Sequence, residues 1–380
     1  TNGAIKTGDG MAMAYRAGVA LKDMEFVQYH PTGLPGTGIL ITEGSRGEGG
    51  ILINRDGYRY LQDYGLGPPD PWPRNKAMEL GPRDRLSQAF WHENQKGRTI
   101  DTPHGDVVHL DLRHLGEKRI DERLPMVRDL ATSYVGVDPV HAPIPVRPVV
   151  HYTMGGIDTD IDAKTRIEGL FAAGECACVS INGANRLGSN SLTELLVFGA
   201  RAGLGAARLA EAEVSHADEA AIREQAAAGD RVGRLFRNTG GGESVAGLRR
   251  EMNATMESGA GIYRTEESLS RSCAVMNDIR RRYADIELED KSNVYNTDLI
   301  QALELDAMID IAGAVIVSAL ARRESRGSHQ RLDHERRDDE AYLKHSLAHY
   351  VAGEDPTIDY RDVVITRSEP GERVYGGAHK

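Results

Sequence analysis

The sequence predicts a mixed α/β or α+β protein with more than one domain. Its 380 residues, of which 40% are hydrophobic and 27% charged, suffice for roughly two or three domains with their own cores. Forty-two glycines and an aromatic content of only 6% are typical of an α/β protein with many tight turns, because glycine adopts backbone conformations that other residues resist. Strand-like and helical patterns alternate in the first half of the chain, whereas helical spacing dominates the second half.

The first part of the chain alternates between helices and strands. The patterns predict a glycine-rich turn and helix over 8–21, strands over 25–30, 39–42 and 51–54, a turn over 55–57, a helix over 83–97, and a strand or hairpin over 105–112. Asp9 stands where its carboxylate either caps the first helix or contacts a ligand hydroxyl. Pro82 places Arg83 at the start of its helix.

The second part becomes increasingly helical. We predict an extended linker over 142–148, interrupted by prolines, with a domain boundary near Arg147. A turn over 157–162 and a buried strand over 170–173 follow, and then a long helix from Ser191 to Arg208. About three packed helices are predicted over 217–320 and an edge strand over 360–367. The charged run 335–340 is predicted to be a solvated face.

The charge of the chain disfavours nucleic acid as a partner. The formal net charge is -11, so the mean field repels phosphates. Arg46, Arg83 and Arg186 each lie in or beside a glycine-rich segment, which suits planar recognition of small carboxylates. We therefore expect an anionic substrate.

The cysteines and the apolar tracts indicate a reducing compartment and no direct membrane insertion. Cys176, Cys178 and Cys273 form no C-x-x-C pair, so neither a disulfide framework nor a metal site is expected. The longest strongly apolar tract, 309–321, is too short to span a bilayer, and no signal peptide is recognised. The chain begins at Thr1 without a Met, and we expect it to be a fragment.

Glycine-flanked segments carry the side chains that could bind a ligand. They are 30–33 (HPTG), 42–50 (TEGSRGEGG) and 151–156 (HYTMGG), although a single His in such a setting is more often a hydrogen-bonded core residue. A further segment, 182–192, runs into a helix whose first turn offers free N–H groups and a positive dipole end. A helix capped by Asn190 or Ser191 would need no ligand.

Together these segments resemble, in order, the flavoprotein subunits of fumarate reductase and succinate dehydrogenase. The resemblance covers almost the whole chain, and its motifs are jointly specific: 28–33 (QYHPTG), 42–44 (TEG), 46–49 (RGEG), 151–156 (HYTMGG) and 183–192 (GANRLGSNSL). Segments 79–84, 87–91 and 374–377 are similar to the fumarate reductase branch. The physiological direction stays open, because both enzymes catalyse one reversible reaction.

The resemblance implies a domain order. A partial FAD-binding Rossmann-like domain would be formed by 1–30 and 150–212, with an inserted capping domain at 31–149, followed by a helical bundle at 213–330 and a small C-terminal subdomain at 331–380. The sequence contains no G-x-G-x-x-G loop, since Gly8 and Gly10 are followed by Met13 and Gly36 and Gly38 by Ile41. The amino-terminal FAD segment, with the histidine to which this family attaches FAD, is therefore expected to be missing, and the chain alone to be inactive.

The resemblance also assigns catalytic and substrate-binding roles. Arg83 would carry the proton, and Glu43 and Arg46 would resupply it. Substrate carboxylates would be held by His151 with Arg186 and by His30 with Thr42. From the residues alone, Glu43 and Arg46 could equally form a surface ion pair, and Arg83 could pair with Asp84.

FAD is the cofactor that the resemblance implies. Its contacts would be Asp9, Glu175, Asn190, Ser191 and Leu192, and the helix that begins near Ser191 would stabilise negative charge on the reduced flavin. No metal site is expected.

The partners implied are fumarate or succinate, an iron–sulfur subunit and membrane anchor subunits. The chain would be peripheral, on the cytoplasmic face of the inner (plasma) membrane, as part of a complex. Two alternatives stay open: a soluble flavoenzyme similar to L-aspartate oxidase, and a non-catalytic truncated assembly module whose former active site is vestigial.

Overall fold

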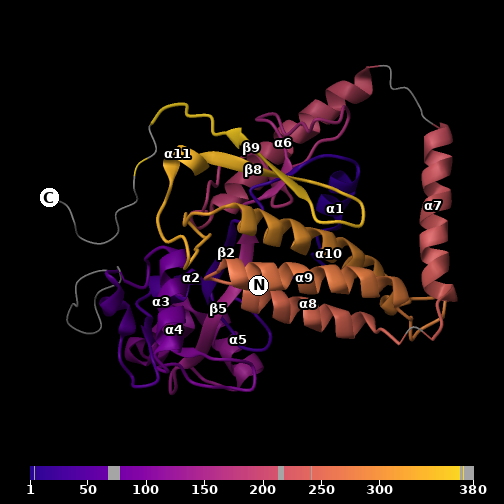
Figure 1. Ribbon diagram of the computed structural model, residues 1–380. Coiled ribbons are helices and arrows are strands. Elements are labelled where there is room, and N and C mark those ends of the chain that lie inside the picture. The colour runs from indigo at the N-terminus through magenta and orange to yellow at the C-terminus, as the bar shows by residue number, and fades with distance from the viewer. Residues whose placement is uncertain (4, 67–77, 213–217, 241, 369–370, 372–380) are drawn as a thin grey trace. The chain divides into compact units, whose positions relative to one another are not determined.

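The computed structural model describes residues 1–3, 5–66, 78–212, 218–240, 242–368 and 371, which fall into two compact units (Figure 1). Unit 1 comprises Thr1–Gly3, Gln28–Tyr152 and Val364–Lys380, and unit 2 comprises Ala4–Val27 and Thr153–Val363. The mixed α/β fold is confirmed. The predicted domain boundaries stay a proposal, and segment 374–377 lies outside the described residues.

Unit 1 is built around a sheet with the strand order β2-β5-β4-β3, in which β4 is antiparallel to both neighbours. Its elements are β2 (Val27–Gly33), α2 (Glu43–Gly47), β3 (Ile51–Ile53), η1 (Tyr60–Tyr64), α3 (Arg83–Gln95), β4 (Val108–Asp111), η2 (Arg113–Leu115), α4 (Glu117–Arg123), α5 (Pro125–Val135) and β5 (Ile144–Thr153). Helices α3, α4 and α5 share one buried core with the sheet, through residues such as Leu86, Ile120, Val127, Leu110 and Ile144.

Strand β5 corrects the prediction of a linker over 142–148. Residues from Ile144 onward form a ten-residue strand, and Ile144 and Val146 pair with Leu110 and Val108 of β4. Prolines 145 and 148 suggested a linker because proline cannot donate to a strand ladder. Burial of Ile144 and Val146 in the core outweighs this local signal.

Two other predicted strands make only an isolated bridge and are not part of a sheet. Segment 39–42 makes only a single bridge, between Leu40 and Gly33, before α2 begins. Phe171 likewise makes only a bridge, to Lys164, so 170–173 is not a strand. A strand needs a neighbouring ladder, and the described residues supply none beyond these bridges.

Unit 2 contains a sheet with the order β7-β6-β1-β8-β9 and a group of long helices (Figure 1). Its elements are α1 (Asp9–Arg16), β1 (Leu21–Lys22), β6 (Gly156–Asp158), β7 (Ala177–Cys178), α6 (Asn190–Glu211), α7 (Asp218–Arg237), α8 (Val245–Gly259), α9 (Glu266–Arg282), η3 (Tyr283–Asp285), α10 (Thr297–Ala321), α11 (Asp339–Tyr342), β8 (Lys344–His349) and β9 (Thr357–Asp362). The first predicted helix therefore ends at Arg16, and the turn predicted over 157–162 begins instead inside β6.

The packed helices predicted over 217–320 are confirmed. Helices α8, α9 and α10 lie side by side, and α9 begins with a capping box in which Thr265 and Ser268 satisfy each other's backbone N–H groups (Figure 1). Helix α10 is apolar nearly all round, because Leu305 and Ile309 pack into the helical core while Ala314 and Val315 pack against the core beneath the sheet.

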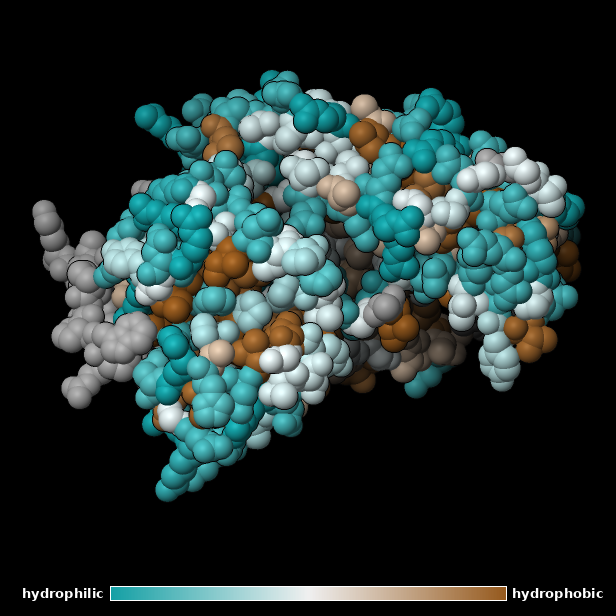
Figure 2. Space-filling view, turned by 90° about the horizontal axis from the view of Figure 1, so that it is seen from below, coloured by the Kyte–Doolittle hydropathy of each residue, from teal (hydrophilic) through white to brown (hydrophobic). Residues whose placement is uncertain are grey.

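The end of the described chain agrees in part with its predicted character. Strand β9 is the edge strand of its sheet, but residues 363–367 of the edge strand predicted over 360–367 lie outside it, because the pairing ends where Asp362 meets Lys344, the first residue of β8. Most of the charged run 335–340 is exposed, as predicted. Among the described residues, no helix is both long and apolar enough to cross a bilayer. The face drawn in Figure 2 is mainly hydrophilic, with hydrophobic residues gathered in separate patches.

Candidate functional site

Unit 1 brings most of the predicted catalytic and substrate-binding residues together. His30 lies on β2, Glu43 and Arg46 on α2, Arg83 at the first position of α3, and His151 on β5 (Figure 1). The charges of Arg46, Arg83 and His151 all act on His30. Side chains from strands β2 and β5 and from helices α2 and α3 thus converge on one site that contains two arginines.

Helix α2 places a carboxylate and a guanidinium on the same face. Thr42 caps the helix, since its hydroxyl accepts a hydrogen bond of 3.3 Å from the N–H of Gly44. The i,i+3 spacing then brings Glu43 Oε2 to 3.5 Å from Arg46 Nη2. The glycine-rich turn that carries Glu43 and Arg46 is thus itself a short helix.

Arg83 points toward α2 and β2. Its Nε and Nη2 each lie 3.2 Å from Glu43 Oε2, and its Nη1 donates to Gln28 Oε1 at 3.1 Å. The side chain of Arg83 is 12% exposed. Glu43, which Arg46 also approaches, therefore lies between the two arginines.

Arg46 is not part of a surface ion pair, because its side chain is fully buried. Its Nη1 donates to the backbone carbonyl of Glu79, while its Nε has no hydrogen-bond partner among the described residues. Burial lowers the pKa of Arg46 to about 10, and the neighbouring Arg83 adds to this effect while Glu43 opposes it. Arg46 is thus a stronger acid than an ordinary arginine.

His30 presents one ring nitrogen as a donor. The N–H of Thr32 donates to Nδ1 at 3.3 Å, so the neutral ring carries its proton on Nε2. That Nε2 atom is buried and has no hydrogen-bond partner among the described residues. Burial, with the charges of Arg46 and Arg83, lowers the pKa of His30 well below its usual value. His30 therefore offers a neutral N–H donor to a ligand.

We expect His30 to make stability fall with acidification. In the unfolded chain His30 binds a proton below about pH 6.5, whereas in the folded protein it stays neutral there. The contribution of His30 to the free energy of unfolding is therefore present above about pH 6.5 and is lost as the pH falls below it. Replacing His30→Gln should remove up to about 1.4 kcal/mol per pH unit from the slope of unfolding free energy between about pH 6.5 and 5. Urea unfolding at several pH values measures this slope. The matched control His141→Gln, at an exposed position, should leave this slope unchanged. Equal slopes in the His30→Gln protein and the parent would contradict a neutral His30 ring in the folded protein.

His151 packs edge-on against His30, with the ring centroids 5.1 Å apart. Its Nδ1 lies 2.7 Å from the hydroxyl of Thr1.

The remaining predicted residues belong to unit 2. Arg186 is nearly buried, at 5% exposure, in the loop before α6. Glu175 Oε1 accepts a hydrogen bond of 3.1 Å from the N–H of Thr153, and burial raises the pKa of Glu175. Asp9 is exposed and accepts a hydrogen bond from the hydroxyl of Thr7, but the cap of α1 is Gly8, so Asp9 is not the N-cap.

Helix α6 begins without a side-chain cap. Its N-cap is Ser189, in the left-handed conformation with φ of 66°, rather than Asn190 or Ser191. Leu187 and Leu192, on either side of this start, are 60% and 65% exposed. The helix therefore presents an open, partly apolar N-terminus.

Two residues of the site lacked an assigned role in the sequence. Gln28 lies on the same face of β2 as His30, two positions away, and this spacing was a usable signal. Glu79 contacts Arg46 through its backbone carbonyl, which no side-chain pattern could reveal.

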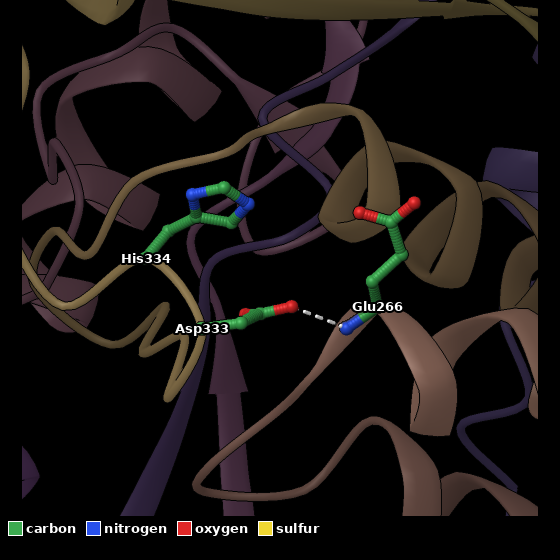
Figure 3. A group of neighbouring side chains, drawn as sticks. All are labelled: Glu266, Asp333 and His334. Atoms are coloured by element: carbon green, nitrogen blue, oxygen red, sulfur yellow. Dashed lines mark hydrogen bonds between the residues drawn. The ribbon is translucent and has the colours of Figure 1, made fainter.

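A separate group of possible metal ligands lies in unit 2, formed by Glu266, Asp333 and His334 (Figure 3). Both carboxylate oxygens of Asp333 are taken by Arg331, at 2.8 and 2.9 Å, and Asp333 also accepts a hydrogen bond from the N–H of Glu266. Arg323 lies 3.9 Å from Glu266. These guanidinium groups already offset the negative charge that a cation would require.

Two family models match the chain. Residues 1–192 match the model described as "FAD binding domain", and residues 249–375 match "Fumarate reductase flavoprotein C-term". These matches agree with the motifs on which the resemblance rests.

Individual proteins give the same result. The chain is 57% identical to the fumarate reductase flavoprotein subunit of Escherichia coli and 42% identical to the succinate dehydrogenase flavoprotein subunit of Rickettsia bellii, with 99% and 97% of the chain covered. It spans 63% of the length of each of these relatives. A solved structure of a mutant of E. coli quinol fumarate reductase FrdA superposes with a TM-score of 0.93 at 56% identity, covering 99% of this chain and 65% of that one. The chain belongs to the family of FAD-dependent flavoprotein subunits of fumarate reductase and succinate dehydrogenase.

Proposed function

We propose that the chain handles the dicarboxylate in the interconversion of fumarate and succinate, as part of an FAD-dependent oxidoreductase. The observation that carries this proposal is the convergence of His30, Glu43, Arg46, Arg83 and His151 within unit 1. Arg46 and Arg83 are cationic, and Glu43 is the acidic residue that they share. Such a site suits a small dianion.

The residues of unit 2 fit a flavin. The start of α6 has no side-chain cap, and the positive end of its helix dipole suits an electron-rich ring edge. The exposed Leu187 and Leu192 offer apolar surface to a flat ring. We propose that Asn190, Ser191 and Leu192 contact the isoalloxazine, that Glu175 binds a ribose hydroxyl, and that Asp9 contacts the ribityl or adenosine part.

The protein residues have to bind the substrate and move a proton, since FAD, when bound, supplies the hydride chemistry. We propose that His30, through its Nε2–H, and Thr42 hold one carboxylate. His151 and Arg186 hold the other. Donors aimed at a carboxylate stabilise the negative charge that accumulates on it in the transition state.

The proton route follows the short contacts of α2 and α3. Arg83 donates a proton to the substrate carbon adjacent to the one that receives the hydride, and Glu43, at 3.2 Å, returns a proton to Arg83. Arg46, at 3.5 Å from Glu43, completes the relay. Its lowered pKa of about 10 makes proton release easier than from an ordinary guanidinium.

The partners belong to the same proposal. An iron–sulfur subunit would transfer electrons between the flavin and a quinol, and membrane anchor subunits would hold the complex at the membrane. The chain would be peripheral, on the cytoplasmic face of the inner (plasma) membrane. The finding that supports this arrangement is the likeness to a subunit of E. coli quinol fumarate reductase.

The proposal is tested by joining the chain to an amino-terminal FAD domain and loading the protein with flavin. We expect fumarate to oxidise reduced viologen in its presence, whereas L-aspartate should not reduce its flavin. Absence of fumarate turnover in the flavin-loaded protein would defeat the catalytic assignment, and flavin reduction by L-aspartate would favour the soluble oxidase instead.

Within this assay, His151→Ala should lower kcat/KM for fumarate by roughly 10²-fold, because one donor to the substrate carboxylate is lost. The change should appear mainly as a higher KM if His151 binds substrate and transition state alike. His141→Ala, at an exposed position of the same unit, is the control. Unchanged kinetics in the His151→Ala protein would remove this residue from the site.

A further inference from the structure

A second ion pair, formed by residues without an assigned role in the reaction, lies next to Arg46. The guanidinium of Arg59 binds the carboxylate of Glu79 through two contacts, with Nε donating to Oε1 at 2.8 Å and Nη2 donating to Oε2. Their side chains are 7% and 1% exposed. The pair is therefore almost completely removed from water.

Glu79 is attached to three parts of unit 1 at once. Its carboxylate also accepts a hydrogen bond of 3.3 Å from the N–H of Leu52 on β3, and its backbone carbonyl accepts one from Nη1 of Arg46. Arg59 immediately precedes η1. Glu79 thus connects α2, β3 and η1 through directional bonds.

Glu79 also fixes the start of α3. It lies in the turn before this helix, which closes with a hydrogen bond of 3.1 Å from Gly81 N–H to the carbonyl of Met78, and Pro82 is the N-cap. The turn is tight, since a Cβ on Gly81 would lie 3.0 Å from that carbonyl. Arg83 follows Glu79 by four residues. The anchor that holds Arg46 therefore also determines where Arg83 begins its helix.

We propose that Arg59 and Glu79 are positioning residues, which hold Arg46 and Arg83 at a fixed separation on either side of Glu43. This inference rests on the proposed proton relay, because positioning matters only if protons pass between these groups. The relay contacts are 3.2 and 3.5 Å long, so a small shift of either arginine breaks the route.

A purely structural role is the weaker explanation. A buried ion pair adds little stability compared with apolar residues of the same volume, because desolvation offsets the attraction. What the pair supplies is direction, through the planar fork of Arg59, and charge, through Glu79. Arg59 orients Glu79, and Glu79 in turn acts on the neighbouring Arg46.

The charge of Glu79 affects the acidity of Arg46. The charged or titratable groups that face Arg46 are His30 on β2, Glu43 on α2, Tyr60 on η1, Glu79, and Arg83 on α3. Glu79 raises the pKa of Arg46 against burial and Arg83. Removal of this negative charge should lower the pKa of Arg46 further.

The experiment compares Glu79→Gln with Glu93→Gln. Glu93 is an equally buried carboxylate on α3, bonded to Asn54 and Tyr64 rather than to Arg46. In the chain itself, with selectively labelled arginines, NMR should show Arg46 titrating near pH 10 in the parent and about one pH unit or more lower in Glu79→Gln. Glu93→Gln should leave this titration unchanged. An unchanged Arg46 titration in folded Glu79→Gln overturns the proposal.

The flavin-loaded protein gives a second readout. Glu79→Gln should reduce kcat at least about tenfold with little change in the KM for fumarate, and the alkaline limb of its pH profile should move to lower pH. If Glu79→Gln does not fold, Arg59→Lys, which keeps the charge and loses the fork, should show the same kcat loss, and an unaltered kcat overturns the proposal. If the parent does not reduce fumarate, the proposed function fails, while the NMR titration still decides whether Glu79 holds Arg46.

Discussion

Replacing Arg83→Lys should reduce fumarate turnover by about 10²- to 10⁴-fold while leaving the flavin bound, as expected for the loss of a general acid. Arg83 makes its contacts with a planar fork, in which Nε and Nη2 face Glu43 and Nη1 faces Gln28. A lysine ammonium is a single point on a flexible stem and cannot hold both partners in this geometry. The assay is oxidation of reduced viologen by fumarate in the flavin-loaded protein, with flavin content read from its absorbance.

The matched control is Arg85→Lys, two residues along the same helix. Arg85 is exposed and donates to Gln88 on the helix itself. We expect it to keep the activity of the parent. Retention of parental turnover by Arg83→Lys would exclude Arg83 as the proton donor, whereas loss of flavin from this variant would show that its effect is structural.

Replacing Arg322→Met should lower the unfolding free energy by about 3–5 kcal/mol, because it leaves the buried carboxylate of Glu25 without its cation, whereas Glu324 keeps Arg326. Arg322 is fully buried and pairs with Glu25 and Glu324, which are also fully buried. It donates further to the backbone carbonyls of Tyr342 and Lys344 at 2.9 and 2.7 Å. These bonds join the end of α10 to the sheet of unit 2. Urea unfolding at neutral pH measures the loss.

A second substitution separates lost charge pairing from lost packing. Adding Glu25→Gln to Arg322→Met removes the uncompensated carboxylate, so part of the stability should return. The control is Arg323→Ala, whose side chain is 59% exposed and lies 3.9 Å from Glu266; its effect should stay within about 0.5 kcal/mol. Equal stability of the Arg322→Met and parent proteins would show that the buried network does not depend on its arginine.

The sequence predicted much of the site because local rules govern its parts. Pro82 predicted the start of α3 at Arg83. The glycine-flanked motifs supplied the family. The substrate-binding and catalytic roles themselves stay predictions until the variants are measured.

Other features of the site had no local signal. The contact of Arg46 with Glu79 uses a backbone carbonyl, and the neutral tautomer of His30 depends on the N–H of Thr32 and on complete burial. The bond between Arg83 and Gln28 joins residues far apart in the chain. Such contacts arise only when a folded backbone brings distant groups to hydrogen-bond distance.

The sequence by itself determined the mixed α/β class, the long helices and the family of this protein, because helical periodicity, caps and glycine motifs act over a few residues. Only the tertiary structure decided that 144–153 is a strand, that 170–173 is not, and that Arg46 is buried. The physical reason is that a strand exists through its neighbours in the sheet, and burial changes the acidity of a side chain through groups that the local sequence does not specify.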